Sequence, residues 1–125
     1  MDFRHLCLLH LLPTVYMTGL IWFVQFAHYP LLAHVGEPTF RSYQEHNLTA
    51  TTRAVLPGMA AELVLAAWLV AAAPVDARPL VWSGAALLAA IWASTFFVQV
   101  PCHTRLSQGF EANSWRRLEV CPTCA

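Results

Sequence analysis

The chain has 125 residues, of which 58% are hydrophobic and only 11% are charged, and its formal net charge is +0. This length allows one domain, and a soluble domain so small could not cover this much apolar surface with so few charges. The neutral balance also leaves no basic surface for nucleic acid. The composition therefore favours a membrane protein, with the lipid bilayer as its first partner.

Three apolar stretches follow one another, at residues 6–32, 54–73 and 80–100. Each reaches the roughly 20 residues that a helix needs to cross the hydrocarbon core, and open sheets cannot satisfy their edges in lipid. The first stretch is too long for a signal peptide and lacks a small-residue cleavage site, so we interpret it as a retained span, tilted or bent near Pro13. We predict an all-α transmembrane helical bundle of three spans in a single integral membrane domain, 1–125.

The two connections between the spans differ in character. Residues 33–53 are polar, and within them residues 38–49 are predicted to form a short interfacial helix, because Glu37 and Pro38 suit a helix start. The second connection, PVDARP, is predicted to be a tight turn between two helices. No internal repeat and no low-complexity tract is evident.

The tail, residues 101–125, combines an amphipathic pattern with three cysteines. A short interfacial C-terminal helix is predicted, with one side formed by Leu106, Phe110, Trp115 and Leu118. Cys121 and Cys124 have the CxxC spacing of redox pairs and of half a zinc site. A single pair without a thioredoxin-like βαβ pattern does not favour either chemistry, so we interpret it as nonfunctional.

Polar side chains concentrate where the first span ends, the second begins and the third ends, which three spans place on one face of the membrane. They are Gln25, His28, Tyr29, His34, His46, Glu62, Gln99, Cys102 and His103. Gln25 and His28 are three residues apart and share a helix face. Glu62 follows Gly58 by four residues, and a glycine there allows close approach of a neighbouring helix.

These residue types suit a metal or cofactor site at the cytoplasmic end of the bundle. Imidazoles and a carboxylate suit iron, copper or zinc, and the candidate ligands are His28, His46, Glu62 and His103. Two axial imidazoles also suit haem, with Gln25, Tyr29 and Gln99 as candidate cofactor-binding residues. We expect the three histidines to line one polar pocket. We expect Glu62 to point into the bundle toward Gln25, His28 or Gln99, because an ionised group facing hydrocarbon costs about 2.5–3.5 kcal/mol.

A simpler interpretation is that His, Gln, Tyr and Trp only anchor helix ends in the headgroup region, while Glu62 pairs with Arg53, His28 or a hydroxyl. The tryptophans Trp22, Trp68, Trp82 and Trp92 are interpreted as lipid-facing or packing groups. Pro101 is expected to end the third helix before His103.

The leading functional hypothesis is a small integral membrane protein that binds a metal ion or haem and acts as an oxidoreductase. The alternative is a noncatalytic subunit that scaffolds a larger membrane complex or a homo-oligomer. A transporter ranks third, because three spans leave little room for alternating access without oligomerisation. Phosphate loops, HExxH and Ser-His-Asp patterns are absent from the sequence, so nucleotide use and nucleophilic hydrolysis have no support.

The segment Trp22–Leu31, WFVQFAHYPL, resembles a family of uncharacterised small bacterial multi-spanning membrane proteins. Further matching positions, up to about Leu118, are Phe40, Tyr43, His46, Pro57, Gly58, Met59, Glu62, Ile91, Trp92, Ser94, Thr95, Gln99, Val100, Pro101, Cys102, His103 and Leu106. The resemblance implies a multi-pass protein of the bacterial inner membrane.

More distantly, the chain is similar to anthrone-oxygenase-like four-helix membrane proteins, which implies a reaction with oxygen or a quinone-type molecule. The resemblance also implies a fourth span after Trp115–Leu118, where this sequence instead continues as EVCPTCA.

The arginines predict the orientation in the membrane. Five lie in the first connection and the tail, namely Arg41, Arg53, Arg105, Arg116 and Arg117, whereas only Arg4 and Arg78 lie on the other side. Because cytoplasmic loops carry the excess of basic residues, the first connection and the tail are predicted to face the cytoplasm.

A cysteine introduced by Ser42→Cys should therefore stay unlabelled when intact cells are treated with a membrane-impermeant maleimide, whereas Asp76→Cys in the second connection should react. Labelling is compared with that of the parent chain, because the parent has four cysteines of its own. Strong labelling of Ser42→Cys together with protection of Asp76→Cys would show the opposite orientation.

Overall fold

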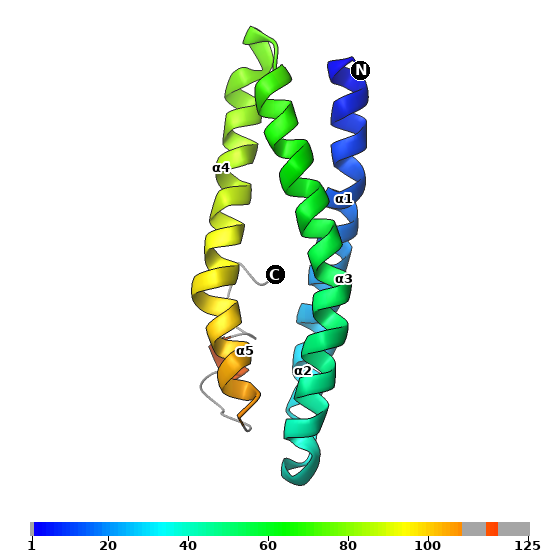
Figure 1. Cartoon of the computed structure of the whole chain (residues 1–125), viewed down its shortest axis with the longest axis vertical. Helices are drawn as coiled ribbons and strands as arrows, with labels where there is room; N and C mark the ends of the chain where they lie inside the picture. Colours follow the sequence, from blue (N-terminus) through cyan, green and yellow to red (C-terminus); the bar gives the residue numbers. More distant parts are fainter. Residues whose placement is uncertain (1, 109–114, 118–125) are drawn as a thin grey trace.

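The computed structural model describes residues 2–108 and 115–117, and these form three long helical segments joined by two short turns (Figure 1). The first segment consists of α1 (Phe3–Phe23), the π-helix η1 (Val24–His28) and α2 (Tyr29–Leu32). The second is α3 (Glu37–Ala72). After the 3-10 turn η2 (Val75–Ala77), the third consists of α4 (Arg78–Ser94), the π-helix η3 (Thr95–Gln99) and α5 (Val100–Leu106).

The three segments agree with the predicted fold class. Phe3–Leu32, Pro38–Ala72 and Val75–Leu106 are each long and apolar enough to cross a membrane. The part of the chain that the structure describes contains no strand. Trp115–Arg117 forms a further helical turn, as predicted for the tail, whereas Phe110, Leu118, Cys121 and Cys124 lie outside the described residues. The all-α membrane architecture is confirmed.

The sequence predicted a separate interfacial helix within the polar connection, and the structure differs from this prediction. The connection is instead the first half of α3, which begins at Glu37 with Pro38 in its first turn and continues to Ala72. A helix of 36 residues is about 54 Å long at 1.5 Å per residue, whereas the hydrocarbon core is about 30 Å thick. The polar half of α3 therefore extends roughly 24 Å beyond the hydrocarbon.

Two prolines, Pro30 and Pro101, lie just after π-helices, and Pro101 is the one that was expected to end the third helix. The N–H of Tyr29 bonds the carbonyl of Val24, one residue before Pro30, and the N–H of Val100 bonds the carbonyl of Thr95, one residue before Pro101. A backbone hydrogen bond that spans five residues widens the helical turn. The wider turn accommodates the following proline ring, whose nitrogen has no hydrogen to donate to the preceding turn. The third segment consequently continues through Pro101 to Leu106, and His103 lies on a helix.

The core of the molecule lies at the end where α2 and α5 meet the polar half of α3. It contains Tyr29, Leu32, Phe40, Cys102 and Leu106, and Leu32 and Leu106 are 0% exposed. The indole of Trp115 packs against this core and donates a hydrogen bond to the carbonyl of Tyr29 (3.0 Å). Away from this end most side chains face outward, where the bilayer replaces water as the solvent.

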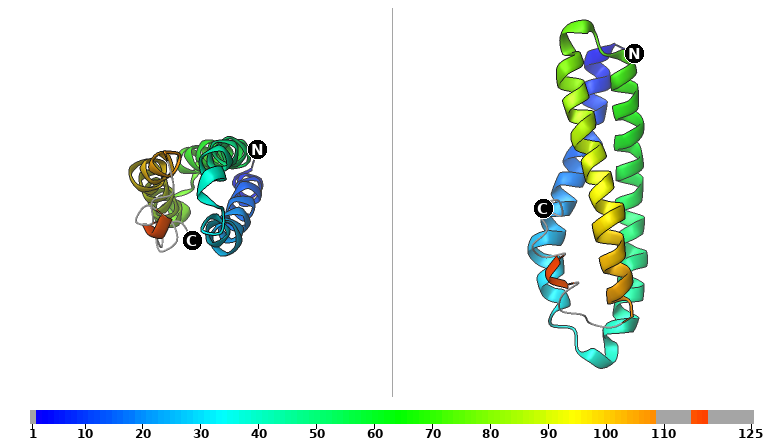
Figure 2. Two further views of the ribbon diagram at one scale, coloured as in Figure 1. Left: turned by 90° about the horizontal axis from the view of Figure 1, so that it is seen from below. Right: turned by 90° about the vertical axis from the view of Figure 1, so that its left-hand side faces the viewer.

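Farther from that core, α3 lies between α1 and α4 (Figure 2). α1 approaches α3 closely at Gly58, where an added Cβ would lie 2.6 Å from the sulfur of Met17 and 3.0 Å from the ring of Tyr16. The hydroxyl of Tyr16 also donates to the carbonyl of Ala54 at 3.0 Å. The predicted close helix approach at Gly58 is thus confirmed.

Gly58→Ala should therefore destabilise the protein by about 1–3 kcal/mol, because the methyl group forces Met17 and Tyr16 away from α3. The matched control is Gly84→Ala on α4, where an added Cβ meets nothing within 4 Å. This control should be neutral or stabilising by up to about 1 kcal/mol. Denaturant titration in detergent micelles measures both, and equal stabilities of the two variants would contradict the packing at Gly58.

Candidate functional site

A row of polar side chains crosses from α3 to α5 and α2 beside the core. The hydroxyl of Thr51 donates to Oδ1 of Asn47 (3.3 Å), and Nδ2 of Asn47 donates to Oε1 of Gln44 (3.4 Å). Nε2 of Gln44 then lies 3.3 Å from Nδ1 of His103, whose Nε2 lies 3.4 Å from the hydroxyl of Tyr29. Each distance is long for a hydrogen bond, so the bonds are individually weak and act as a set.

Gln44 determines which nitrogen of His103 carries the proton. Its side chain is 0% exposed, and its oxygen accepts from Asn47, which directs the amide nitrogen toward the ring. An amide nitrogen can only donate, so Nδ1 of His103 is an acceptor and the proton of the neutral ring is on Nε2, facing Tyr29. The arrangement fixes the orientation of His103 rather than exposing it to water.

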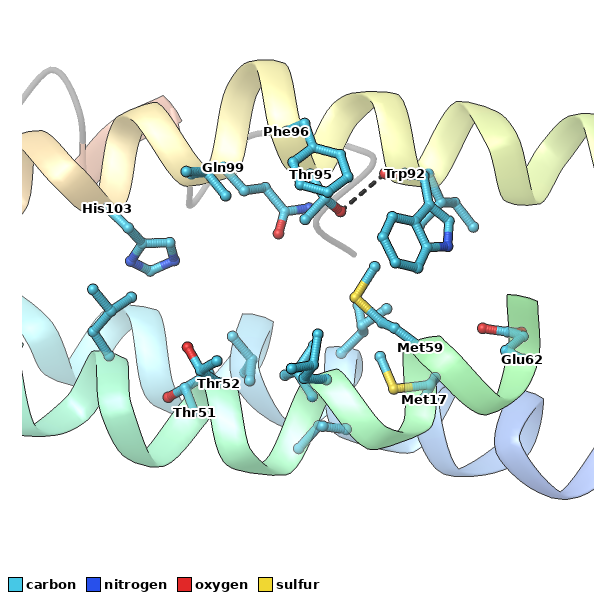
Figure 3. A pocket seen from close by; sticks show the side chains of 18 of the residues that line it. Met17, Thr51, Thr52, Met59, Glu62, Trp92, Thr95, Phe96, Gln99 and His103 are labelled. Atoms are coloured by element: carbon cyan, nitrogen blue, oxygen red, sulfur yellow. Dashed lines mark hydrogen bonds between the residues drawn. The ribbon is translucent and has the colours of Figure 1, made fainter. Parts of the chain in front are cut away.

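An interhelical cavity of about 420 Å³ opens next to this row, between α1, α3 and α4 (Figure 3). Its wall is mainly apolar, with Met17, Ile21, Leu56, Met59 and Phe96 among the lining residues. Two polar ends interrupt this wall. We call one the amide end, formed by Asn47, Thr51, Gln99 and His103, and the other the carboxylate end, formed by Thr14 and Glu62.

At the amide end, the carboxamide of Gln99 and the ring of His103 point from the third segment across the cavity toward α3, where Thr51 and Thr52 lie (Figure 3). The π-helix η3 ends at Gln99, and α5 then carries His103 one turn farther. Gln99 thus brings two donors and an acceptor to the cavity wall, next to an imidazole that is already held in place.

At the carboxylate end, Oε1 of Glu62 accepts a hydrogen bond of 3.0 Å from the hydroxyl of Thr14 on α1. That hydroxyl also lies 3.4 Å from Nδ1 of His10 and 3.0 Å from the carbonyl of His10. Glu62 points into the bundle, and its partner comes from the first span, as expected. The partner is Thr14 and not one of the three favoured residues, because Gln25, His28 and Gln99 lie toward the other end of the helices.

The structure brings some of the predicted site residues together and separates others. The ring of Tyr29 lies 6.1 Å from that of His28 and 6.0 Å from that of His103, measured between centroids. His46 is exposed, and its Nδ1 bonds the carbonyl of Ser42 one turn back at 2.9 Å. The expectation that His46 shares a pocket with His28 and His103 is wrong, because His46 is on the outer face of α3.

The described residues contain no group of three or more His, Cys, Asp or Glu side chains that could hold a metal ion. Glu62 is roughly 27 Å along α3 from Gln44, at 1.5 Å per residue, and so lies far from His103. The proposed ligands His28, His46, Glu62 and His103 therefore do not form one cluster. Comparison of the chain with known protein families, curated proteins and solved structures finds no match.

Sequence reasoning missed Gln44, Thr14 and Trp92 as members of the site. Gln44 gave no signal because it lies in a polar stretch, and only the continuation of α3 as one helix places it against α5. Thr14 is four residues from His10 and donates a hydrogen bond to Glu62. A hydroxyl group was one possible partner that the sequence suggested for Glu62, without identifying the residue that carries it. Trp92 lines the cavity, whereas Trp22, Trp68 and Trp82 are exposed, as interpreted.

Gln44→Leu should lower the free energy of unfolding by about 1–3 kcal/mol, because it leaves Nδ1 of His103 and Nδ2 of Asn47 without partners. Gln108→Leu is the matched control, since Gln108 is exposed and should change stability by less than about 0.5 kcal/mol. Thermal unfolding in micelles compares the two. If both variants unfold alike, the row of hydrogen bonds through Gln44 contributes nothing to stability.

Proposed function

We propose that this membrane protein binds an elongated, mainly apolar small molecule in the interhelical cavity, with a polar head group at the amide end. The observation that carries the proposal is a predominantly apolar cavity with convergent polar groups at its ends. Cavities of about 300–1,000 Å³ with this pattern are typical of small-molecule sites. The cavity of about 420 Å³ falls within that range.

The length of the cavity supports an elongated molecule. Along α3 its lining runs from Asn47 to Glu62, which is about 22 Å at 1.5 Å per residue. The side chains between these positions are Leu48, Thr51, Thr52, Val55, Leu56 and Met59. Methionines from α1 and α3 meet in the middle, and their flexible, polarizable side chains adapt to irregular apolar ligands.

The chemistry of the amide end supports an uncharged head group. Gln99 offers both donors and an acceptor, and His103 is held as a neutral ring by Gln44 and Tyr29. Among the residues that the structure describes, no arginine or lysine lines the cavity, so a carboxylate or phosphate would lack a charge partner there. A carbonyl or a hydroxyl head fits this end.

The hypothesis of a metal or haem rests on fewer residues than the sequence suggested. His28 and His103 on either side of Tyr29 are the imidazoles that this region offers, and Nε2 of His28 is buried without a hydrogen-bond partner among the described residues. Metal analysis and an absorption spectrum of the purified protein test this possibility directly. The hypothesis of an oxidoreductase activity depends on the outcome of these two measurements.

The second candidate function is a noncatalytic subunit of a larger membrane complex. It is favoured by the large exposed apolar side chains on α1 and α4, such as Leu12, Phe23, Leu80 and Leu87. Such side chains face lipid equally well, so this observation alone does not identify a partner.

The test is photolabelling in bilayers with a long-chain methyl ketone that carries a diazirine in the middle of its chain. Labelling of Met17 and Met59 should saturate and be displaced by the unreactive ketone, whereas labelling of the lipid-facing Leu80 and Phe97 should not saturate. Gln99→Leu should weaken binding about 3- to 10-fold, the loss expected for one hydrogen bond. Gln108→Leu should leave it unchanged.

Two outcomes would overturn the proposal. Nonsaturable labelling at Met59, equal to that at Phe97, would show that ordinary lipid chains fill the cavity. Crosslinks from Met59 to a second polypeptide would show instead that a protein helix occupies it, which is the result expected of a subunit.

A further inference from the structure

The carboxylate end of the cavity places an acidic side chain near the middle of the membrane. Glu62 lies ten residues before the end of α3 at Ala72, about 15 Å along the helix, which is half of the roughly 30 Å hydrocarbon thickness. Its carboxyl group points toward the cavity (Figure 3). Ionisable side chains at such a depth are costly and mark functional sites.

One of the two carboxyl oxygens of Glu62 is available to a molecule in the cavity. Oε1 accepts the hydrogen bond of 3.0 Å from Thr14. Oε2 has no hydrogen-bond partner among the described residues, and it is not one of the polar atoms that are both buried and unpartnered. Since Glu62 is itself only partly buried, a small group in the cavity can reach Oε2. A carboxylate oxygen only accepts, so a group that binds there must donate.

The surroundings of Glu62 provide no opposite charge. Among the described residues no arginine or lysine lines the cavity, and the one imidazole in its lining, that of His103, lies at the opposite end. His10 reaches Glu62 only through a hydroxyl, since its Nδ1 lies 3.4 Å from that of Thr14. Charged side chains inside membranes are usually paired, so a ligand that brings a positive charge fits this end better than a neutral ligand.

These two requirements select one functional group, which must donate a hydrogen bond and carry a positive charge. A carbonyl or an ether has no hydrogen to donate, and a hydroxyl donates without a charge. A protonated amine does both, and a charge-assisted hydrogen bond is about twice as strong as a neutral one. We infer that the carboxylate end binds the ammonium group of a lipophilic amine, which donates to Oε2 of Glu62. This inference rests on the proposed function, because it adds a second contact to the same elongated molecule.

The ligand class that follows is a basic amphiphile, an apolar chain or ring system with an uncharged polar head at the amide end and an amine at the carboxylate end. The apolar section between the two polar groups contains Met17 and Met59. Glu62 repels anionic lipophiles such as fatty acids, for which no described lining residue supplies a cation. The carboxylate end therefore selects ligands by the sign of their charge.

The test compares two long-chain methyl ketones of equal length in bilayers, both with the diazirine. One ends in a dimethylamino group, and the other ends in an isopropyl group, which has a similar shape and no charge. At equal mole fraction in the bilayer the amine should bind about 10- to 100-fold more tightly, as one hydrogen bond to a charged group does. Equal affinity of the two probes for the parent protein would overturn the inference, while the proposed function would stand.

Glu62→Gln removes the charge and keeps an oxygen that can accept from Thr14. It should abolish the preference for the amine and leave the affinity for the isopropyl probe unchanged. Glu45→Gln is the matched control, because Glu45 is exposed on the same helix, and both affinities should equal those of the parent. A preference that persists in Glu62→Gln would overturn the inference, because the amine would then be recognised elsewhere.

A measurement on the parent protein covers the case that Glu62→Gln folds poorly. Dicyclohexylcarbodiimide, an apolar reagent that modifies carboxyl groups, should react with Glu62, and mass spectrometry locates the adduct. At equal occupancy of the cavity the amine should protect Glu62 more than the isopropyl probe does. Equal protection would contradict the contact between the ammonium group and Glu62. Failure of both probes to bind saturably would overturn the proposed function itself.

Discussion

The small core at the end of the bundle is the constraint on which the rest of the structure depends. Between helices in lipid there is no hydrophobic driving force, because the lipid chains are as apolar as the side chains. Where α3 continues beyond the hydrocarbon, water restores that force, and Tyr29, Leu32, Phe40 and Leu106 become a core. This core fixes α2 and α5 against α3. The row of hydrogen bonds from Gln44 to His103 forms on its flank, so the amide end of the cavity is positioned by packing outside the membrane.

The sequence predicted the features that depend on composition and on local signals. The three apolar spans, the helix start at Glu37 and the close approach at Gly58 follow from such signals, and the structure agrees with them. It did not predict the features that depend on helix register. The structure continues α3 past residue 50 as one helix, and the register of that helix places His46 outside and Gln44 inside. The polar composition of residues 33–53 is compatible with a short helix that ends near residue 50 and with a long helix that continues past it.

The two π-helices share one feature of position, a proline two residues after each of them ends. Both contain the dipeptide Val-Gln, at Val24–Gln25 and Val98–Gln99, and both precede a proline. The segments that hold them run in the same direction on either side of α3 (Figure 2). Each π-turn keeps its helix continuous past a residue that would otherwise break it. The tripeptide Phe-Val-Gln occurs at both places in the sequence, but it stands at the start of η1 and at the end of η3, so the position that the two π-helices share is that of the proline which follows them.

The packing of α1 and α4 against α3, with the cavity between them, has a consequence for how a ligand arrives. A molecule that enters sideways comes from the acyl chains and has already left water, so its transfer from water contributes to partitioning into the bilayer and not to binding. Selectivity then depends on the few polar contacts at the two ends. Occupancy is governed by the chemical potential of the ligand among the surrounding lipids. Two membranes that hold the same mole fraction of ligand but differ in lipid composition would therefore saturate this protein to different extents, whereas two membranes in equilibrium with the same free aqueous concentration would saturate it equally.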